Sequence, residues 1–225
     1  MEYIVKILKI ESLTSNVKRF AVEKPKNYNL ISGQHTLVSI NKSELKNKKK
    51  PFSFSSSEKN DFLEFIIKIY DDGKFTQQLN NLKKDDELII NEPKGKISYK
   101  GKGVFIAAGT GINPFISITK SLDEKERKKN FLIYLNKTQK DIILESELKK
   151  LFNNDAIFIL SREKKTGYEH GHIDKTFLKN ILKGINKFKN FNQNFYVCGP
   201  FKLVSELKKI LIELGAKQEN IISEI

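Results

Sequence analysis

The sequence VFIAAGTGINP, residues 104–114, runs from an apolar stretch through a glycine-rich turn into a helix start. Val104–Ala108 shows no polar alternation, which is typical of a strand buried on both faces of a parallel sheet. Asn113 is suited to cap a helix, and Pro114 is suited to be its first residue. The segment therefore predicts a strand, a tight turn and a helix in direct succession.

The turn itself has the composition of an anion site. Gly109 and Gly111 let backbone approach a ligand closely, and Thr110 offers a hydroxyl between them. The free amides and the dipole at the start of the following helix suit a pyrophosphate. Glycine turns of this kind also occur in proteins that bind no ligand, so the turn alone leaves both interpretations open.

Outward from this turn, residues 101–225 alternate apolar runs with helical patterns. The further runs are Phe131–Leu135, Ala156–Leu160 and Phe195–Val197, and the helical patterns are Pro114–Leu122, Leu144–Phe152, Asp174–Leu182 and Pro200–Leu214. This alternation predicts a Rossmann-like, doubly wound parallel sheet. Ligands of such sheets bind beyond the carboxyl ends of the strands.

Residues 1–100 have a different pattern. Short β-rich runs occur at Tyr3–Ile10, Val17–Val22, Thr36–Ile40, Phe62–Tyr70 and Glu87–Ile90, and a single helical stretch at Phe75–Leu82. Gly and Pro at the corners favour a small antiparallel barrel. We therefore expect two domains, a β-barrel over 1–100 and an α/β domain over 101–225.

The net charge of +14 comes almost entirely from lysine, because only three of the 41 basic residues are arginine. Nucleic-acid-binding proteins usually bind through arginine and through basic stripes interleaved with aromatic residues, whereas these lysines are spread over the whole chain. We therefore expect no nucleic-acid partner. A non-catalytic basic binding module and a basic surface that steers an acidic protein partner remain as alternatives.

Cys198 is the only cysteine, which excludes a disulfide framework, a cysteine zinc site and a cluster needing four thiolates. No apolar run is long enough to span a bilayer, and the first ten residues lack a signal-peptide cleavage site. These features predict a cytoplasmic protein without a membrane span. His170 and His172 have no evident third ligand, so we expect no metal site.

Three other segments carry unusual residues. Cys198-Gly199-Pro200 follows a strand end, where the thiol is either inert and buried or borders a ligand; no base lies beside it to make it a nucleophile. Lys50–Ser56 alternates aromatics with hydroxyls, which also suits a plain strand. Gly73–Thr76 places a glycine turn and a hydroxyl at a helix start, either as an anion site or as a capped loop.

In order and spacing, these segments resemble the ferredoxin–NADP reductase superfamily over nearly the full chain. The matching segments are Gly33-Gln34, Lys50-Pro51-Phe52-Ser53 (for the flavin motif Arg-x-Tyr/Phe-Ser/Thr), Gly73-Lys74-Phe75-Thr76, Pro93 with Gly95, Gly109–Pro114, Cys198-Gly199-Pro200 and Ser223-Glu224-Ile225. The resemblance implies an enzyme that binds FAD on the barrel and NAD(P)H on the second domain. The cofactors would carry the hydride chemistry, and the protein would position them.

The resemblance also implies roles for residues of the barrel. Phe52 would pack on the isoalloxazine ring, and Ser53 would hydrogen-bond near flavin N5. The other flavin-binding residues implied are Lys50, Pro51, Ile67, Lys68, Ile69, Gly73, Lys74, Phe75 and Thr76. Lysine replaces the family's arginine at position 50, and a compact ammonium cannot form a guanidinium's bidentate fork on phosphate; Lys48 and Lys49 are placed to help.

In the second domain, Thr110 and Cys198 would border the nicotinamide, with Glu224 near the reacting centre. The nucleotide-binding residues implied are Gly109, Thr110, Gly111, Asn113, Pro114, Ser161, Arg162, Tyr168, Cys198, Gly199 and Pro200. Ser161-Arg162 occupies the place that binds the 2′-phosphate in NADP-using relatives, which favours NADPH over NADH. Tyr168 would stack on the adenine. Many relatives end in an aromatic residue over the flavin, whereas this chain ends in Ile225, which leaves that face more open.

No fused cluster, haem or second flavin domain is visible in the sequence, so electrons would leave to a separate acceptor. We expect a monomer that passes them to an acidic carrier such as ferredoxin or flavodoxin. Reduction of a free flavin or a quinone is the alternative.

Overall fold

The computed structural model describes residues 1–185, 188 and 190–224. The chain divides into two compact units, one comprising Met1–Ser98 with Asn113–Ser121 and the other comprising Tyr99–Ile112 with Leu122–Ile225. Each unit is described separately below. The predicted role of Ile225 falls outside the described residues.

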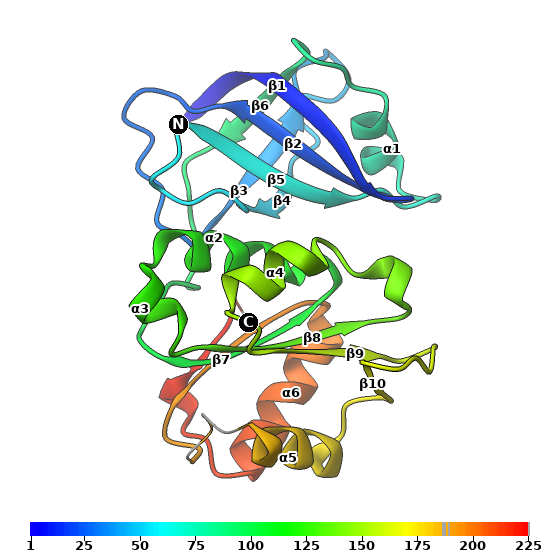
Figure 1. The fold of residues 1–225 in the computed structure, drawn as a ribbon. Helices are drawn as coiled ribbons and strands as arrows, with labels where there is room; N and C mark the ends of the chain where they lie inside the picture. The colour runs from blue at the N-terminus through cyan, green and yellow to red at the C-terminus, as the bar shows by residue number, and fades with distance from the viewer. Residues whose placement is uncertain (186–187, 189, 225) are drawn as a thin grey trace. The chain divides into compact units, whose positions relative to one another are not determined.

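The first unit is built on an antiparallel sheet (Figure 1). Its elements are β1 (Glu2–Thr14), β2 (Val17–Glu23), β3 (His35–Ile40), β4 (Lys50–Ser53), β5 (Phe62–Lys68), α1 (Lys74–Asn80), β6 (Glu87–Asn91) and α2 (Asn113–Ser121). The strand order is β4-β3-β6-β1-β2-β5. A bridge between Phe54 and Phe65 brings the end of β4 to β5, so the sheet curls toward a closed barrel as its pattern predicts.

Aromatic rings fill the interior of this unit. Phe20, Phe54 and Phe65 are fully buried, and the rings of Phe54 and Phe65 lie 5.0 Å apart. In β1, Val5 and Ile7 face inward while Ile4, Lys6 and Leu8 face outward, and in β2 the buried residues are Val17, Phe20 and Val22. Together with the aliphatic side chains of the same core, these rings stabilise the unit by about 25 cal/mol per Å² of apolar surface buried.

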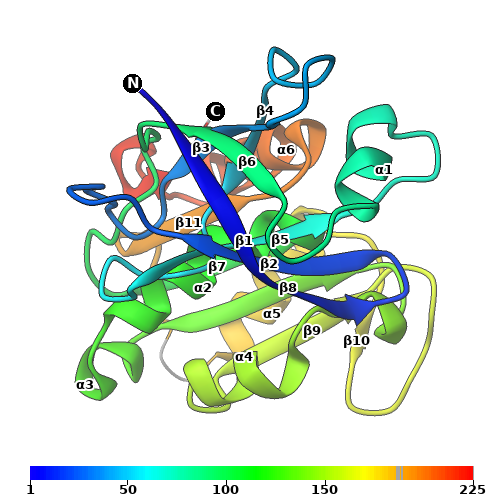
Figure 2. The same ribbon diagram turned by 90° about the horizontal axis from the view of Figure 1, so that it is seen from above.

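The second unit is a parallel sheet with the strand order β10-β9-β8-β7-β11-β12. Its elements are β7 (Gly103–Ala108), the 3₁₀ turn η1 (Gly109–Ile112), α3 (Glu124–Arg127), β8 (Phe131–Asn136), η2 (Gln139–Asp141), α4 (Glu145–Leu151), β9 (Ala156–Leu160), β10 (Glu169–His170), α5 (Lys175–Gly184), β11 (Asn194–Cys198), α6 (Phe201–Glu213), η3 (Gln218–Asn220) and β12 (Ile221–Ile222). Figure 2 shows β7, β8 and β9 side by side in this order. The predicted fold class, a barrel followed by a Rossmann-like domain, is confirmed.

Helices cover both faces of the parallel sheet. Helices α5 and α6 pack on one face through residues such as Leu178 and Leu207, and α4 lies on the other (Figure 1). The two short strands β10 and β12 at the sheet edges have too few residues for a periodic signal and are absent from the sequence prediction. Among the described residues, no helix is both long and apolar enough to cross a bilayer.

Helix α2 follows the glycine turn, but it packs within the first unit through polar contacts. The Asn113 amide nitrogen donates to the carbonyl of Ile66 at 2.7 Å. The Ser117 hydroxyl donates to the carbonyl of Ser56 at 2.6 Å and accepts from the amide of Gly33 at 3.3 Å. The predicted cap is therefore wrong: Asn113 is the first residue of α2, Ile112 is the N-cap, and the Asn113 side chain bonds to β5 instead.

The same helix brings a cation to a buried carboxylate. Glu64 on β5 lies 3.5 Å from the ammonium of Lys120 and 3.7 Å from the guanidinium of Arg19. The Ser55 hydroxyl also donates to this carboxylate at 2.8 Å. A buried charge that lost these partners would carry its full desolvation cost, so the cluster fixes α2 specifically against β5.

We predict that Ser117→Ala lowers the free energy of unfolding by about 1–3 kcal/mol, because it leaves the buried carbonyl of Ser56 and the amide of Gly33 without this partner. The matched control is Ser121→Ala on the same helix, whose half-buried hydroxyl bonds only to the carbonyl of Ile118 within α2. Its loss is expected to stay near 0.5 kcal/mol or below, as is usual for such sites. Urea unfolding of both variants measures the difference, and equal losses would show that Ser117 does not hold the helix.

Candidate functional site

The expected flavin-binding residues gather at one place in the first unit. The rings of Phe52 on β4 and Phe75 on α1 lie nearly parallel, 6.3 Å apart and inclined by 22°. This contact joins Lys50–Ser53 to Gly73–Thr76, which lie twenty residues apart in the sequence. Phe52 and Ser53 are half-buried, so a ligand can reach both.

The turn before α1 is tightly closed. A Cβ atom at Gly73 would lie 2.3 Å from the hydroxyl of Thr76, so only glycine fits this position. The Thr76 hydroxyl accepts from the amide of Tyr70 and donates to the carbonyl of Gly73, both at 3.1 Å. No side chain caps the first turn of α1, which leaves its amides available to an anion.

Cations surround this site unevenly. Lys49 forms an ion pair with Glu2, so its ammonium group already has a partner. Lys48 and Lys50 are exposed, and neither forms an ion pair among the described residues. Uncapped amides, an aromatic surface and unpaired ammonium groups together fit a ligand that carries both a planar ring and phosphates.

Ile67 and Ile69 are among the residues expected to line the flavin. Both side chains are buried in the apolar core of the first unit. Lys68, between them, is half-exposed, and its ammonium lies 5.9 Å from the ring centroid of Tyr70. Of these three residues, only Lys68 presents its side chain toward the surface.

The expected nucleotide-binding residues of the second unit gather at the carboxyl ends of β7 and β11. These strands are parallel neighbours, with Cys198 opposite Ala107. A Cβ atom at Gly111 would lie 2.4 Å from the carbonyl oxygen of Cys198 and 2.7 Å from the Cα of Gly199. The glycine turn and the Cys-Gly-Pro segment therefore lie in direct backbone contact.

The turn has room for a ligand at Gly109. Its φ is +53°, in the region that favours glycine, and no atom lies within 4 Å of the position that a Cβ would occupy. Asn136, at the end of β8, adds a buried amide nitrogen with no close hydrogen-bond partner among the described residues, although its side chain interacts with the Tyr134 hydroxyl. Open space above the backbone and an unsatisfied donor at this sheet edge fit an anionic nucleotide.

Ser161 and Arg162 follow β9 at the same sheet edge. The backbone amide of Ser161 donates to the carbonyl of Asn136 at 3.0 Å, and that of Arg162 to the carbonyl of Lys137 at 2.9 Å. The Arg162 side chain is exposed and makes no ion pair among the described residues. These backbone bonds fix the segment and leave the guanidinium available to a phosphate.

Tyr168 is more constrained than expected for an adenine platform. Its hydroxyl lies 3.0 Å from both carboxylate oxygens of Glu145 and accepts from the Gln139 amide at 2.9 Å. Its ring lies 6.4 Å from that of Phe158 at 70°. The half-buried ring is thus held in one orientation, with its remaining face available.

Cys198 and Glu224 influence each other electrostatically. Burial is the main cause that raises the pKa of the Cys198 thiol, and the negative charge of Glu224 adds to it, giving a value of about 12. The thiol is therefore neutral at physiological pH and cannot act as a nucleophile, as the absence of a neighbouring base predicts.

Sequence reasoning missed Tyr134 and Asn136. Asn136 follows a buried strand, so the rule that ligands bind at carboxyl ends would have found it. Tyr134 lies inside the same apolar run and carries no sequence signal that distinguishes it from a core residue. Among the described residues, no group of three His, Cys, Asp or Glu side chains could hold a metal ion.

Two family models match the chain, one after the other along the sequence. The oxidoreductase FAD-binding domain family matches residues 4–99, and the oxidoreductase NAD-binding domain family matches residues 105–209. NADH-cytochrome b5 reductase 2 of Kluyveromyces lactis is 32% identical over 96% of this chain and 81% of its own length. The Aspergillus fumigatus protein of the same name is 29% identical over 96% of this chain and 76% of its own length.

Solved structures show the same fold. A ferredoxin NADP⁺ reductase from Neisseria gonorrhoeae with bound FAD and NADP superimposes with a TM-score of 0.86 at 20% identity, over 98% of this chain and 96% of its own. The CS-b5R domains of human Ncb5or superimpose with a TM-score of 0.83 at 25% identity, over the whole of this chain and 70% of theirs.

The fold and the two family matches define a flavoprotein oxidoreductase that binds FAD and a pyridine nucleotide. More particularly, the chain belongs to the ferredoxin–NADP reductase superfamily, as its motifs indicate.

We predict that alkylation of Cys198 by iodoacetamide is slow in the folded protein and rises about tenfold per pH unit from pH 8 to pH 10, because the thiolate fraction grows in that proportion below a pKa of about 12. In urea the rate should level off near pH 9, the ordinary value. Glu224→Gln removes the neighbouring charge and should speed alkylation of the folded protein. A plateau below pH 9 in the folded wild type would contradict the raised pKa. Mass spectrometry of quenched samples measures the rates.

Proposed function

We propose that the barrel of residues 1–100 holds FAD and that residues 101–225 hold NADPH, which gives up a hydride to the flavin. The observation that carries this proposal is the pairing of two glycine turns with two ligand surfaces, one in each unit. When bound, FAD accepts an electron pair and can release electrons singly. The protein's own task is to bind, orient and shield the two cofactors.

In the first unit, the Phe52 ring would pack on the flavin, and the Ser53 hydroxyl would hydrogen-bond at its reacting edge. Lys50 and the uncapped amides of Lys74 and Phe75 would hold the pyrophosphate. Thr76 would keep these amides in position, because its hydroxyl bonds to the backbone of Tyr70 and Gly73 and so closes the turn. Pro51, Lys68 and Gly73 would complete the site.

In the second unit, Thr110 and Cys198 would border the nicotinamide, with Glu224 close by. The neutral thiol fits a steric and polar role, since it carries no charge at physiological pH. Gly109, Gly111, Gly199 and Pro200 would shape the backbone against the nucleotide, and Asn113 and Pro114 begin the helix that continues the turn.

The preference for NADPH rests on Arg162. Its guanidinium is exposed on a segment that backbone bonds hold in place. A guanidinium suits a 2′-phosphate because of its fork of donors. The named relatives carry NADH in their names and one structural neighbour holds NADP, so direct comparison of both nucleotides is the decisive measurement.

We predict that Arg162→Ala lowers kcat/KM for NADPH by about 10- to 100-fold, since a charge-assisted bond contributes about 1.5–3 kcal/mol, and leaves kcat/KM for NADH within about twofold. The control is Lys164→Ala, a neighbouring exposed cation, which should change neither value appreciably. Steady-state kinetics with both nucleotides measure the effect. Equal losses with NADPH and NADH would assign Arg162 to the shape of the loop instead.

The proposed electron acceptor is a separate acidic carrier protein. Lys42, Lys46, Lys48 and Lys50, here called the lysine segment, are all exposed, and this stretch leads directly into β4 with Phe52 and Ser53. A positive field beside the flavin site would raise the association rate of an acidic partner. Ferredoxin and flavodoxin fit this description, and the relatives' names add cytochrome b5 as a carrier to test.

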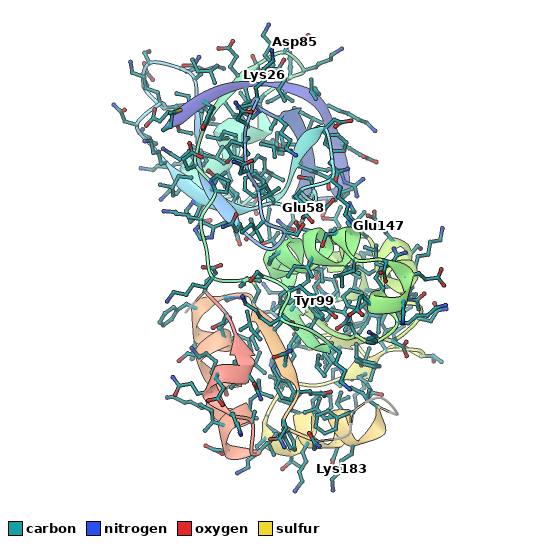
Figure 3. The ribbon with its side chains drawn as sticks, turned by 90° about the vertical axis from the view of Figure 1, so that its left-hand side faces the viewer. Lys26, Glu58, Asp85, Tyr99, Glu147 and Lys183 are labelled. Carbon is teal, nitrogen blue, oxygen red and sulfur yellow. The ribbon has the colours of Figure 1, made fainter. Side chains whose placement is uncertain are left out.

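We predict that kcat/KM for such a carrier falls at least about tenfold between roughly 20 mM and 500 mM salt, because ions screen the field. Reduction of a small neutral quinone should change less than about twofold. The double variant Lys42→Glu/Lys46→Glu should weaken carrier reduction at low salt but spare the quinone. Lys183→Glu, on α5 of the second unit (Figure 3), serves as the control for a charge outside the lysine segment.

The measurement is stopped-flow or steady-state reduction of ferredoxin, flavodoxin and cytochrome b5 beside the quinone. If carrier and quinone respond to salt alike, the lysine segment has no steering role. A free flavin or quinone is then the acceptor to pursue.

A further inference from the structure

A buried tyrosine beneath the glycine turn has no role in the proposed function so far. Tyr134 lies on β8, and its side chain has 0% exposure. Its hydroxyl donates to the carbonyl oxygen of Gly109 at 2.9 Å. Burial raises the pKa of Tyr134 far above its ordinary value, so the hydroxyl keeps its proton and remains a donor.

This hydrogen bond fixes the direction of one peptide group in the turn. No peptide bond among the described residues is cis, so the Gly109–Thr110 peptide is planar and trans. In a trans peptide, the C=O and N–H groups point in opposite directions. Because the carbonyl of Gly109 points down to the Tyr134 hydroxyl, the amide N–H of Thr110 points away from the core.

The rest of the turn restrains this peptide only weakly, through the single short 3₁₀ turn η1 over Gly109–Ile112. Gly109 has a φ of +53° and no atom within 4 Å of its Cβ position, so no side-chain packing restrains it from above. Glycine also has the widest choice of backbone conformations. Without the tyrosine hydroxyl, the backbone bonds of the short 3₁₀ turn η1 would be left to hold the Gly109–Thr110 peptide, and the direction of the Thr110 amide would be less firmly fixed.

We propose that Tyr134 is a positioning residue for the pyridine nucleotide: its hydroxyl holds the Gly109–Thr110 peptide so that the Thr110 amide faces the bound nucleotide. The inference rests on the proposed placement of NAD(P)H at this turn. It concerns a part of the site common to NADPH and NADH, so Tyr134 should affect both nucleotides alike, in contrast to Arg162.

The second unit supplies a matched control in Tyr196. This residue lies on β11, also has 0% exposure, and donates its hydroxyl to the carbonyl of Gly101 at 2.6 Å while accepting from the amide of Lys100 at 2.8 Å. The ring of Tyr99, labelled in Figure 3, stacks on it at 6.1 Å. Gly101 precedes β7, so this bond lies at the opposite end of the sheet from the turn.

The test compares Tyr134→Phe and Tyr196→Phe, which remove the same atom from equally buried rings. NADP⁺ and NAD⁺ are titrated into the FAD-loaded proteins by calorimetry, flavin content is measured by absorbance, and the unfolding midpoint by thermal denaturation. We expect Tyr134→Phe to raise the dissociation constant of both nucleotides about five- to tenfold, as for loss of one hydrogen bond. Tyr196→Phe should stay within about twofold of wild type, although it loses at least as much thermal stability.

Flavin content should remain equal to wild type in both variants, and KM for the nucleotide should rise more than kcat falls in Tyr134→Phe. Unchanged nucleotide affinity in Tyr134→Phe would overturn the proposal, as would an equal loss in Tyr196→Phe, which would indicate general destabilisation. A wild-type protein that binds FAD but neither nucleotide would instead refute the assignment of the turn, and the role of Tyr134 with it.

Discussion

Backbone contact between Gly111 and the Cys198–Gly199 segment is the constraint on which the nucleotide side of the protein depends. A single added carbon at position 111 would lie 2.4 Å from the carbonyl oxygen of Cys198. Contact this close joins the ends of two neighbouring parallel strands without any intervening side chain. The surface above them consequently consists of backbone groups, whose directions are set by the strands and which no rotamer change can alter.

Helix α2 shows how the chain uses polar contacts for position. Asn113, Ser117 and Lys120 recur along one face of the helix, and each meets a polar group of the first unit. Apolar packing is non-directional and tolerates small shifts, whereas a buried hydrogen bond loses its energy when its geometry changes. The helix that continues the glycine turn is therefore fixed in rotation as well as in depth within its unit.

Much of this architecture is readable from the sequence, because each local signal agrees with the fold. The uninterrupted apolar runs at Val104–Ala108 and Phe131–Leu135 are buried strands, and the change of pattern near residue 100 marks a change of architecture. The edge strands β10 and β12 are too short to show a period.

The errors and omissions concern tertiary partners. Asn113 has the residue type of a helix cap, but the helix already includes it, and its amide nitrogen donates to a carbonyl of β5. In the sequence, Tyr134 is indistinguishable from the other residues of its apolar strand, because the neighbouring residues do not indicate that its hydroxyl bonds to the carbonyl of Gly109. That Ile67 and Ile69 line the flavin stays a prediction, and their side chains lie in the apolar core of the first unit. The hydrogen-bond partner and the burial of these side chains depend on which distant residues the fold brings next to them.

The protonated state of Cys198 has a consequence for how the protein withstands oxidants. Peroxides attack thiolates, and the first product is a sulfenic acid that proceeds to further, irreversible oxidation. A thiol with a pKa of about 12 presents almost no thiolate at neutral pH. Because Cys198 is the only cysteine in the chain, no second thiol is present to form an intramolecular disulfide with it. The single sulfhydryl of the chain is thus held in the form that resists oxidation.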